Sequence, residues 1–296
     1  MTPAEPPVTD ATAGTHALGG EAPVRRLGFG AMRITGEGIW GPPADRGEAL
    51  RVLRRAVELG VNLIDTADAY GPDVSEELIA EALHPYPDDL VVATKGGLVR
   101  PGPGRWETDG RPEHIREACE GSLRRLRLDR IDLYQFHAPD SDVPFEDSVG
   151  TFAELRDEGK VRLVGLCNVS AEQLERALEI VPVVSVQNRY NLTDRDSEDV
   201  LEACERHGIG FIPWFPLATG DLARSGGPLD EAAQRHGAAP SQVAIAWLLA
   251  RSGAMLPIPG TGSVAHLEEN CAAAGIELDP EEVAALEAAA GADGSA

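Results

Sequence analysis

Four side chains capable of proton transfer lie at or just beyond the ends of short apolar segments in this chain. Asp65 and Tyr70 fall within GVNLIDTADAYG, from Gly60 to Gly71. Lys95 ends LVVATK, and His137 ends IDLYQFH. Lys95 is one of only two lysines among twenty-six basic residues, and arginine cannot replace a compact ammonium with a readily shifted pKa. The pattern predicts a site for proton transfer.

The chemistry that best suits these residue types is the reduction of an aldehyde or ketone. A tyrosine has an ordinary pKa of about 10, which a neighbouring ammonium lowers, so we expect Lys95 to make Tyr70 a better proton donor. Asp65 would pair with Lys95, because a lone buried ammonium is costly. His137 could hydrogen-bond to the substrate carbonyl. The hydride must come from a nicotinamide, because side chains cannot supply one.

Each of these residues also has a purely structural explanation. Asp65 could cap a turn, Tyr70 could be a rim aromatic, and His137 could be a core histidine. Lys95 could be a lysine without a special role that was retained while the composition of the chain shifted toward arginine. Their coincidence at successive strand ends favours the functional interpretation.

The elements that must position these residues follow a strand–helix alternation from Leu27 onward. This predicts a parallel sheet covered on both faces and, at 296 residues, a closed (β/α)8 TIM barrel. A doubly wound sheet is the competitor, but its GxGxxG fingerprint is absent. The candidate strands are 27–32, 62–65, 90–95, 131–137, 162–167, 183–187, 211–215 and 255–258. The candidate helices include 46–59, 113–126, 146–158, 172–180, 197–206, 241–251 and an outer terminal helix, 280–289.

Further polar residues at the predicted strand ends could hold a dinucleotide. Asn168 and Gln187 each offer a donor and an acceptor, which matches a primary amide such as the nicotinamide carboxamide. Trp214 could stack on the ring. In PIPGTGSVAHLEEN (257–270), two glycines and two hydroxyl residues precede a predicted helix, a pattern typical of a phosphate-binding turn.

Composition limits the partners. A net charge of −23 argues against nucleic acid and anionic membrane surfaces, and no apolar run is long enough to span a membrane. Four widely spaced cysteines without a CxxC pair indicate reduced thiols in a cytoplasmic protein. Residues 1–22, rich in Pro, Ala, Thr and Gly, predict a flexible tail, and residues 23–296 predict one barrel domain. We expect a monomer or a weak homo-oligomer.

The sequence resembles the aldo-keto reductase superfamily, and the resemblance is collinear from about Leu27 to the end of the chain. It rests on the segments GVNLIDTADAYG, VVATK, LYQFH, KVRLVGLCN and PIPGTGSVAHLEEN, which are similar to successive signatures of that superfamily. The resemblance implies a barrel that binds NADPH without a Rossmann domain, and a catalytic tetrad of Asp65, Tyr70, Lys95 and His137 with Tyr70 as general acid. The opening LGFGAMRITGEGIWGPP and the PWFPL segment are similar to bacterial members grouped with pyridoxal reductases. The cofactor contacts implied are Ala31, Met32, Asp65, Cys167, Asn168, Gln187, Trp214, Phe215, Pro216, Leu217, Pro259, Gly260, Thr261, Gly262, His266, Glu269 and Asn270.

The chain departs from the family pattern at three places. Cys167 stands where a serine is usual, a change that keeps a small polar side chain. His266 replaces an arginine that grips the 2′-phosphate of NADPH in many members, and Gly260-Thr261 replaces a Lys-Ser pair. Each lost charge-assisted hydrogen bond corresponds to roughly 1.5–3 kcal/mol, so NADH is also a possible cofactor.

The substrate is expected to be a small-molecule carbonyl, with pyridoxal-like compounds as candidates. Met32, Trp40 and Trp106 should line the pocket, the last within a mobile glycine-proline stretch, RPGPGRWETDGRP. One alternative is an NADPH-binding regulatory subunit with little turnover, although His137 speaks against it. Another is a metal-dependent hydrolase using Asp65, Asp68 and His137, but it lacks paired histidine ligands, so we expect no metal.

Overall fold

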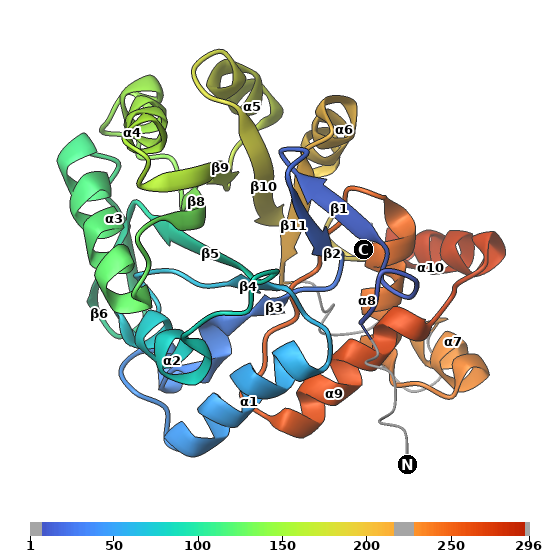
Figure 1. Cartoon of the computed structure of the whole chain (residues 1–296). Helices are drawn as coiled ribbons and strands as arrows, with labels where there is room; N and C mark the ends of the chain where they lie inside the picture. The colour runs from blue at the N-terminus through green and yellow to red at the C-terminus, as the bar shows by residue number, and fades with distance from the viewer. Residues whose placement is uncertain (1–7, 216–227, 294–296) are drawn as a thin grey trace.

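A curled parallel sheet surrounded by helices forms the body of the molecule (Figure 1). The computed structural model describes residues 8–215 and 228–293. Seven strands pair in the order β11-β10-β9-β8-β5-β4-β3, which confirms the predicted α/β barrel architecture. Their bounds are β3 Phe29–Gly30, β4 Leu63–Asp65, β5 Val91–Gly96, β8 Ile131–Phe136, β9 Val161–Cys167, β10 Val183–Arg189 and β11 Gly210–Trp214.

The eighth strand position is occupied by an irregular segment, so the strand predicted at 255–258 is wrong in detail. Met255 makes only an isolated parallel bridge to Phe211. Pro257 has no N–H to donate to a ladder, yet its carbonyl accepts from the Gly28 N–H at 2.9 Å. The segment therefore links β11 to the start of β3 without being a regular strand. The predicted strand at 27–32 is also shorter than expected, because a 3-10 turn begins at Ala31.

Ten α-helices lie within the described residues, and most follow a strand as the alternation predicted. In α1, Asp45 accepts a hydrogen bond from the Glu48 N–H and so caps the first turn, while Ala49, Val52 and Leu53 pack inward. The apolar α8 is buried as predicted, and α10 lies on the outside (Figure 1). The bounds are α1 Arg46–Glu58, α2 Val74–Leu83, α3 Pro112–Leu126, α4 Phe145–Asp157, α5 Ala171–Leu178, α6 Glu198–His207, α7 Pro228–His236, α8 Pro240–Arg251, α9 Val264–Ala272 and α10 Pro280–Asp293.

The N-terminal region contains a hairpin where the sequence predicted a flexible tail over residues 1–22. Strands β1 (Thr15–Leu18) and β2 (Ala22–Arg25) pair antiparallel. The three-residue connection Gly19–Glu21 contains two glycines at positive φ, Gly19 and Gly20, a conformation that glycine adopts without strain. Leu18 and Val24 are fully buried against the barrel interior. The tail prediction is therefore wrong for residues 8–22, where apolar burial outweighs a composition typical of loops.

The barrel interior changes from apolar to polar along the strands. Because side chains alternate between faces with a period of two, the inward positions of β5 are Val91, Ala93 and Lys95. The layers nearer the amino ends of the strands are apolar, and they are built from residues such as Leu63, Leu133, Leu163, Ile212 and Leu256. The layer at the carboxyl ends is polar and contains Asp65, Lys95, Gln135 and Gln187. The fold thus brings the candidate residues to one end of the barrel, where barrel active sites lie.

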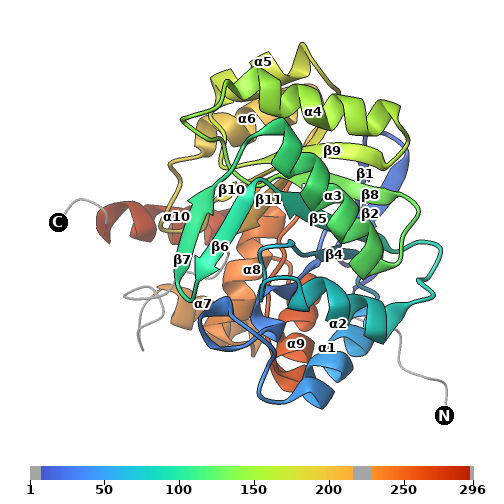
Figure 2. The same cartoon turned by 90° about the vertical axis from the view of Figure 1, so that its left-hand side faces the viewer.

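A second hairpin leaves the barrel after β5. Strands β6 (Leu98–Gly102) and β7 (Arg105–Thr108) form their own two-stranded sheet, which Figure 2 shows apart from the barrel strands. Gly104 in the turn has a φ of 69°, a conformation that glycine adopts without strain. The stretch predicted to be a mobile loop is therefore paired structure. Within the described residues, none of the helices combines the length and apolarity needed to cross a membrane.

Candidate active site

A cavity of about 560 Å³ opens at the carboxyl ends of the strands. Its walls are mostly apolar and aromatic, with few polar groups, which is typical of a site for a small molecule. The lining residues are Gly30, Met32, Arg33, Asp65, Tyr70, Leu98, Trp106, His137, Asn168, Trp214, Phe215, Ile258, Pro259 and Gly260.

A buried ion pair lies at the floor of this cavity. Lys95 Nζ is 2.5 Å from Asp65 Oδ2, and the two side chains are 0% and 2% exposed. The ammonium also donates to the Thr66 carbonyl at 2.9 Å and to Tyr70 Oη at 3.2 Å. All three N–H groups of the ammonium thus have acceptors. The Tyr70 oxygen consequently lies in direct contact with a fixed positive charge.

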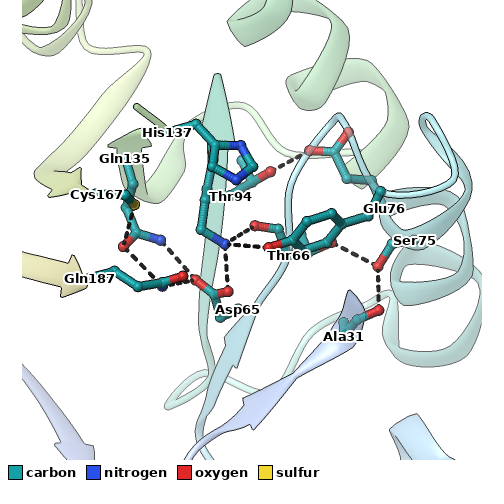
Figure 3. Close-up of polar contacts among 12 residues, drawn as sticks. Ala31, Asp65, Thr66, Ser75, Glu76, Thr94, Gln135, His137, Cys167 and Gln187 are labelled. Carbon is teal, nitrogen blue, oxygen red and sulfur yellow. Dashed lines mark hydrogen bonds and ion pairs between the residues drawn. The ribbon is translucent and has the colours of Figure 1, made fainter. Parts of the chain in front are cut away.

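Two amides hold the other oxygen of Asp65. Gln135 Nε2 and Gln187 Nε2 donate to Asp65 Oδ1 at 2.8 and 2.9 Å, and Figure 3 shows the three side chains pointing toward one another. Cys167 Sγ lies 3.9 Å from Gln135 Oε1. Gln135 was missed by the sequence analysis. It lies on β8, two residues before His137, which directly follows the strand, so the period of two could have identified it as facing the same side.

Burial and neighbouring charges shift the pKa values of Lys95 and Tyr70 in opposite directions. Burial alone would lower the pKa of Lys95, but its contact with Asp65 raises that pKa above the ordinary value. For Tyr70, burial raises the pKa, and the opposing effect of Lys95 does not cancel it. The predicted lowering of the Tyr70 pKa is therefore wrong for the protein alone, because desolvation of a phenolate outweighs one ammonium that is already paired.

His137 is neutral at pH 7. Burial, with a smaller effect from Lys95, lowers its pKa well below the ordinary value, and its Nδ1 is buried without a partner among the described residues. The ring meets Tyr70 edge-on at 5.9 Å between centroids. A neutral imidazole beside a phenol can donate or accept one hydrogen bond without adding charge.

The buried histidine has a consequence for stability. Between its lowered folded pKa and about 6.5, the unfolded chain binds a proton that the folded chain does not, so stability falls as pH falls. We expect His137→Asn to reduce this loss by as much as about 1.4 kcal/mol per pH unit below about 6.5. Urea denaturation of both proteins at pH 7, 6 and 5 measures it. Parallel stability profiles would contradict a neutral His137.

The predicted cofactor residues fall into three groups. Met32, Asp65, Asn168, Trp214, Phe215, Pro259 and Gly260 line the cavity. Pro216 and Leu217 lie outside the described residues. The remaining ones are not in the cavity wall: Ala31, Cys167 and Gln187 are buried, and Thr261, Gly262, His266, Glu269 and Asn270 lie in the turn before α9 and on that helix.

A hydrogen bond joins Asn168, which follows β9, to Trp214 at the end of β11. Asn168 has a positive φ of 56°, its Nδ2 donates to the His137 carbonyl at 2.9 Å, and its Oδ1 accepts from Trp214 Nε1 at 2.9 Å. One amide proton and one lone pair of Asn168 remain for a ligand. The indole of Trp214 is 36% exposed at the cavity.

Of the predicted substrate-pocket residues, the structure places Met32 and Trp106 in the cavity wall but not Trp40. Trp40 instead lies beside Arg100, 5.6 Å from the guanidinium carbon to the ring centroid. Arg33, Leu98 and Ile258 line the cavity and were missed. The described residues contain no group of three or more His, Cys, Asp or Glu side chains that could hold a metal ion.

The chain is similar to known reductases over nearly its whole length. The family model described as "Aldo/keto reductase family" matches residues 26–290. An uncharacterized oxidoreductase of Schizosaccharomyces pombe is 49% identical, covering 97% of this chain and 93% of the relative. Pyridoxine 4-dehydrogenase of Escherichia coli is 42% identical, covering 92% and 97%. The structure of a Klebsiella pneumoniae aldo-keto reductase in complex with NADPH is 28% identical with a TM-score of 0.78, covering 93% of this chain and 94% of that one.

Proposed function

The chain belongs to the aldo/keto reductase family, and on that premise we propose that it reduces a small-molecule carbonyl to the alcohol with NADPH, using Tyr70 as the proton donor. The observation that carries the proposal is the contact of Tyr70 Oη with the buried Lys95–Asp65 pair at the floor of a cavity also lined by His137. The related K. pneumoniae reductase was solved with NADPH.

The residues at the cavity fit a nicotinamide cofactor. NADPH, when bound, supplies the hydride. The exposed face of Trp214 would stack on the ring. The remaining amide positions of Asn168, and Gln187 Oε1, which accepts no hydrogen bond within the described residues, would hold the carboxamide. The turn at 259–262 precedes α9, whose first-turn N–H groups other than that of Val264, which donates to Glu48, would be available to a phosphate.

The chain's own groups supply the proton. Tyr70 stays protonated at neutral pH because burial raises its pKa, so the hydroxyl proton is present to hydrogen-bond to a substrate oxygen. When that oxygen takes the proton, the tyrosinate left behind lies 3.2 Å from the Lys95 ammonium, which stabilises it. Asp65 keeps the ammonium in place, and neutral His137 can donate to the same substrate oxygen and orient it.

We propose a planar aromatic aldehyde of the pyridoxal type as substrate. The cavity walls carry Trp106, Trp214 and Phe215, which suit a flat ring, and one relative is a pyridoxine 4-dehydrogenase. Oxidation of NADPH on addition of pyridoxal, followed by absorbance, tests this directly. Turnover would support the proposal. Tight NADPH binding without turnover of any carbonyl would instead favour a regulatory subunit.

The preference for NADPH over NADH is expected to be modest. His266 is exposed on the first turn of α9, and the Val264 N–H there already donates to Glu48 Oε1 at 3.0 Å. We expect His266→Arg to raise the NADPH-to-NADH affinity ratio roughly fivefold, the size of one exposed charge-assisted contact. Fluorescence titration with each cofactor measures the ratio, and His266→Gln is the uncharged control. An equal gain in both affinities would count against a 2′-phosphate contact.

A cytoplasmic location is also proposed. The four cysteines are free and buried, which suits a reducing compartment.

A further inference from the structure

Arg100 on β6 is a buried arginine whose hydrogen-bond acceptors are all backbone carbonyls. The residue is 8% exposed, and within the described residues it pairs with no carboxylate. Its Nη1 donates to the Ile39 and Ala69 carbonyls at 2.9 and 3.3 Å, and its Nη2 donates to Gly38 at 3.1 Å. Its Nε donates to the Arg105 carbonyl at 2.9 Å. The planar guanidinium of Arg100 thus donates hydrogen bonds to four backbone carbonyls.

These acceptors belong to three different segments of the chain. Gly38 and Ile39 lie in the loop after β3, Ala69 precedes Tyr70 in the loop after β4, and Arg105 lies across the hairpin. The first two loops also meet directly, where the Gly41 N–H donates to the Gly71 carbonyl at 2.6 Å. Arg100 therefore ties the hairpin to the segment that carries the proton donor.

The guanidinium also stacks on the hairpin's tryptophan. Its central carbon lies 3.7 Å from the Trp106 ring centroid, a close cation–π contact. On its other sides, the Trp106 ring meets Tyr70 at 6.3 Å and His137 at 6.5 Å between centroids, both edge-on. Trp106 is 38% exposed, and within the described residues Arg100 stacks on its ring while Tyr70 and His137 meet it edge-on.

We propose that Arg100 is a positioning residue that fixes Trp106 as a rigid wall of the substrate pocket, and that this wall selects planar aromatic carbonyls over small aliphatic ones. The inference rests on the proposed function. Arginine is required because a lysine ammonium, a point charge on a flexible stem, cannot stack as a plane and reach acceptors on three loops at once. A pre-positioned indole lowers the ordering cost of binding a flat ring.

The kinetic test compares Arg100→Met with wild type on pyridoxal and butanal. We expect kcat/KM for pyridoxal to fall about tenfold, mainly through a higher KM, because the variant loses the cation–π contact that orders Trp106. For butanal, kcat/KM should change less than about twofold. Arg100→Lys should not rescue the ratio. Arg105→Met, which alters an exposed arginine paired with Glu107 on the same hairpin, is the matched control and should leave the ratio unchanged.

A double-mutant comparison shows whether Arg100 acts through Trp106. In the Trp106→Ala background, Arg100→Met should cause no further change in the pyridoxal-to-butanal ratio. An equal loss for both substrates, or an additive effect in the double variant, would overturn the proposal. A misfolded variant would lower kcat for both substrates without changing KM, and NADPH titration counts the folded fraction.

A measurement without turnover separates this inference from the proposed function. Hydrogen exchange in Arg100→Met should quicken at residues 98–108 and 36–41 and stay unchanged in β8 and β9. Unchanged exchange at those two segments would refute the proposed positioning role of Arg100. If exchange quickens but the wild-type protein reduces neither pyridoxal nor butanal, the positioning role of Arg100 is supported, while the proposed function and the assigned selectivity are both wrong.

Discussion

Tyr70→Phe is expected to lower kcat for carbonyl reduction by about 10²–10⁴-fold, the usual contribution of a positioned general acid. The change removes only the hydroxyl that contacts Lys95 at 3.2 Å. The phenyl ring keeps the edge contacts with Trp106 and His137, so the cavity shape and NADPH affinity should be unaffected. Single-turnover kinetics with saturating NADPH isolates the chemical step.

The matched control is Tyr86→Phe. Tyr86 is partly buried and donates to the Leu126 carbonyl at 2.8 Å, and it does not line the cavity. Its loss should leave kcat unchanged. A Tyr70→Phe protein that reduces pyridoxal at near wild-type rate would show that another group supplies the proton.

Lys95→Met is expected to destabilise the fold by about 3–5 kcal/mol, the usual effect of removing one partner of a buried ion pair. The substitution leaves the Asp65 carboxylate buried with only the two amide donors from Gln135 and Gln187. It also removes the donor to the Thr66 carbonyl. Urea denaturation at pH 7 gives the change in the free energy of unfolding.

The double variant Asp65→Asn/Lys95→Met separates the charge from the packing. Without a charge at either position, no uncompensated ion remains, while an asparagine oxygen can still accept from Gln135 and Gln187. We expect the double variant to be more stable than Lys95→Met alone, with a coupling free energy of roughly 1–3 kcal/mol. Additive losses would mean that the two side chains stabilise the barrel independently of their charges.

Much of the barrel and the placement of the four candidate proton-transfer residues followed from local pattern. Lys95 and His137 end apolar runs that are regular strands, and in a parallel barrel all such ends meet at one face. The approximate placement of β4, β5, β8, β9, β10 and β11 was therefore predictable, and so was the approach of Asp65 to Lys95. The terminal hairpin was not, because a composition of Pro, Ala, Thr and Gly does not reveal that Leu18 and Val24 find a buried surface.

The sequence by itself determined the residue types at the strand ends, and hence the reductive chemistry that they suit, since strand periodicity is a local property. Only the tertiary structure decided that burial outweighs Lys95 at Tyr70, because desolvation depends on every residue packed around the group. It also decided that the Arg100 guanidinium stacks on Trp106 in the cavity wall while it donates to the Ala69 carbonyl. The hydrogen bond from Arg100 to the Ala69 carbonyl joins residues that are 31 positions apart in the chain, and no local spacing encodes such a contact.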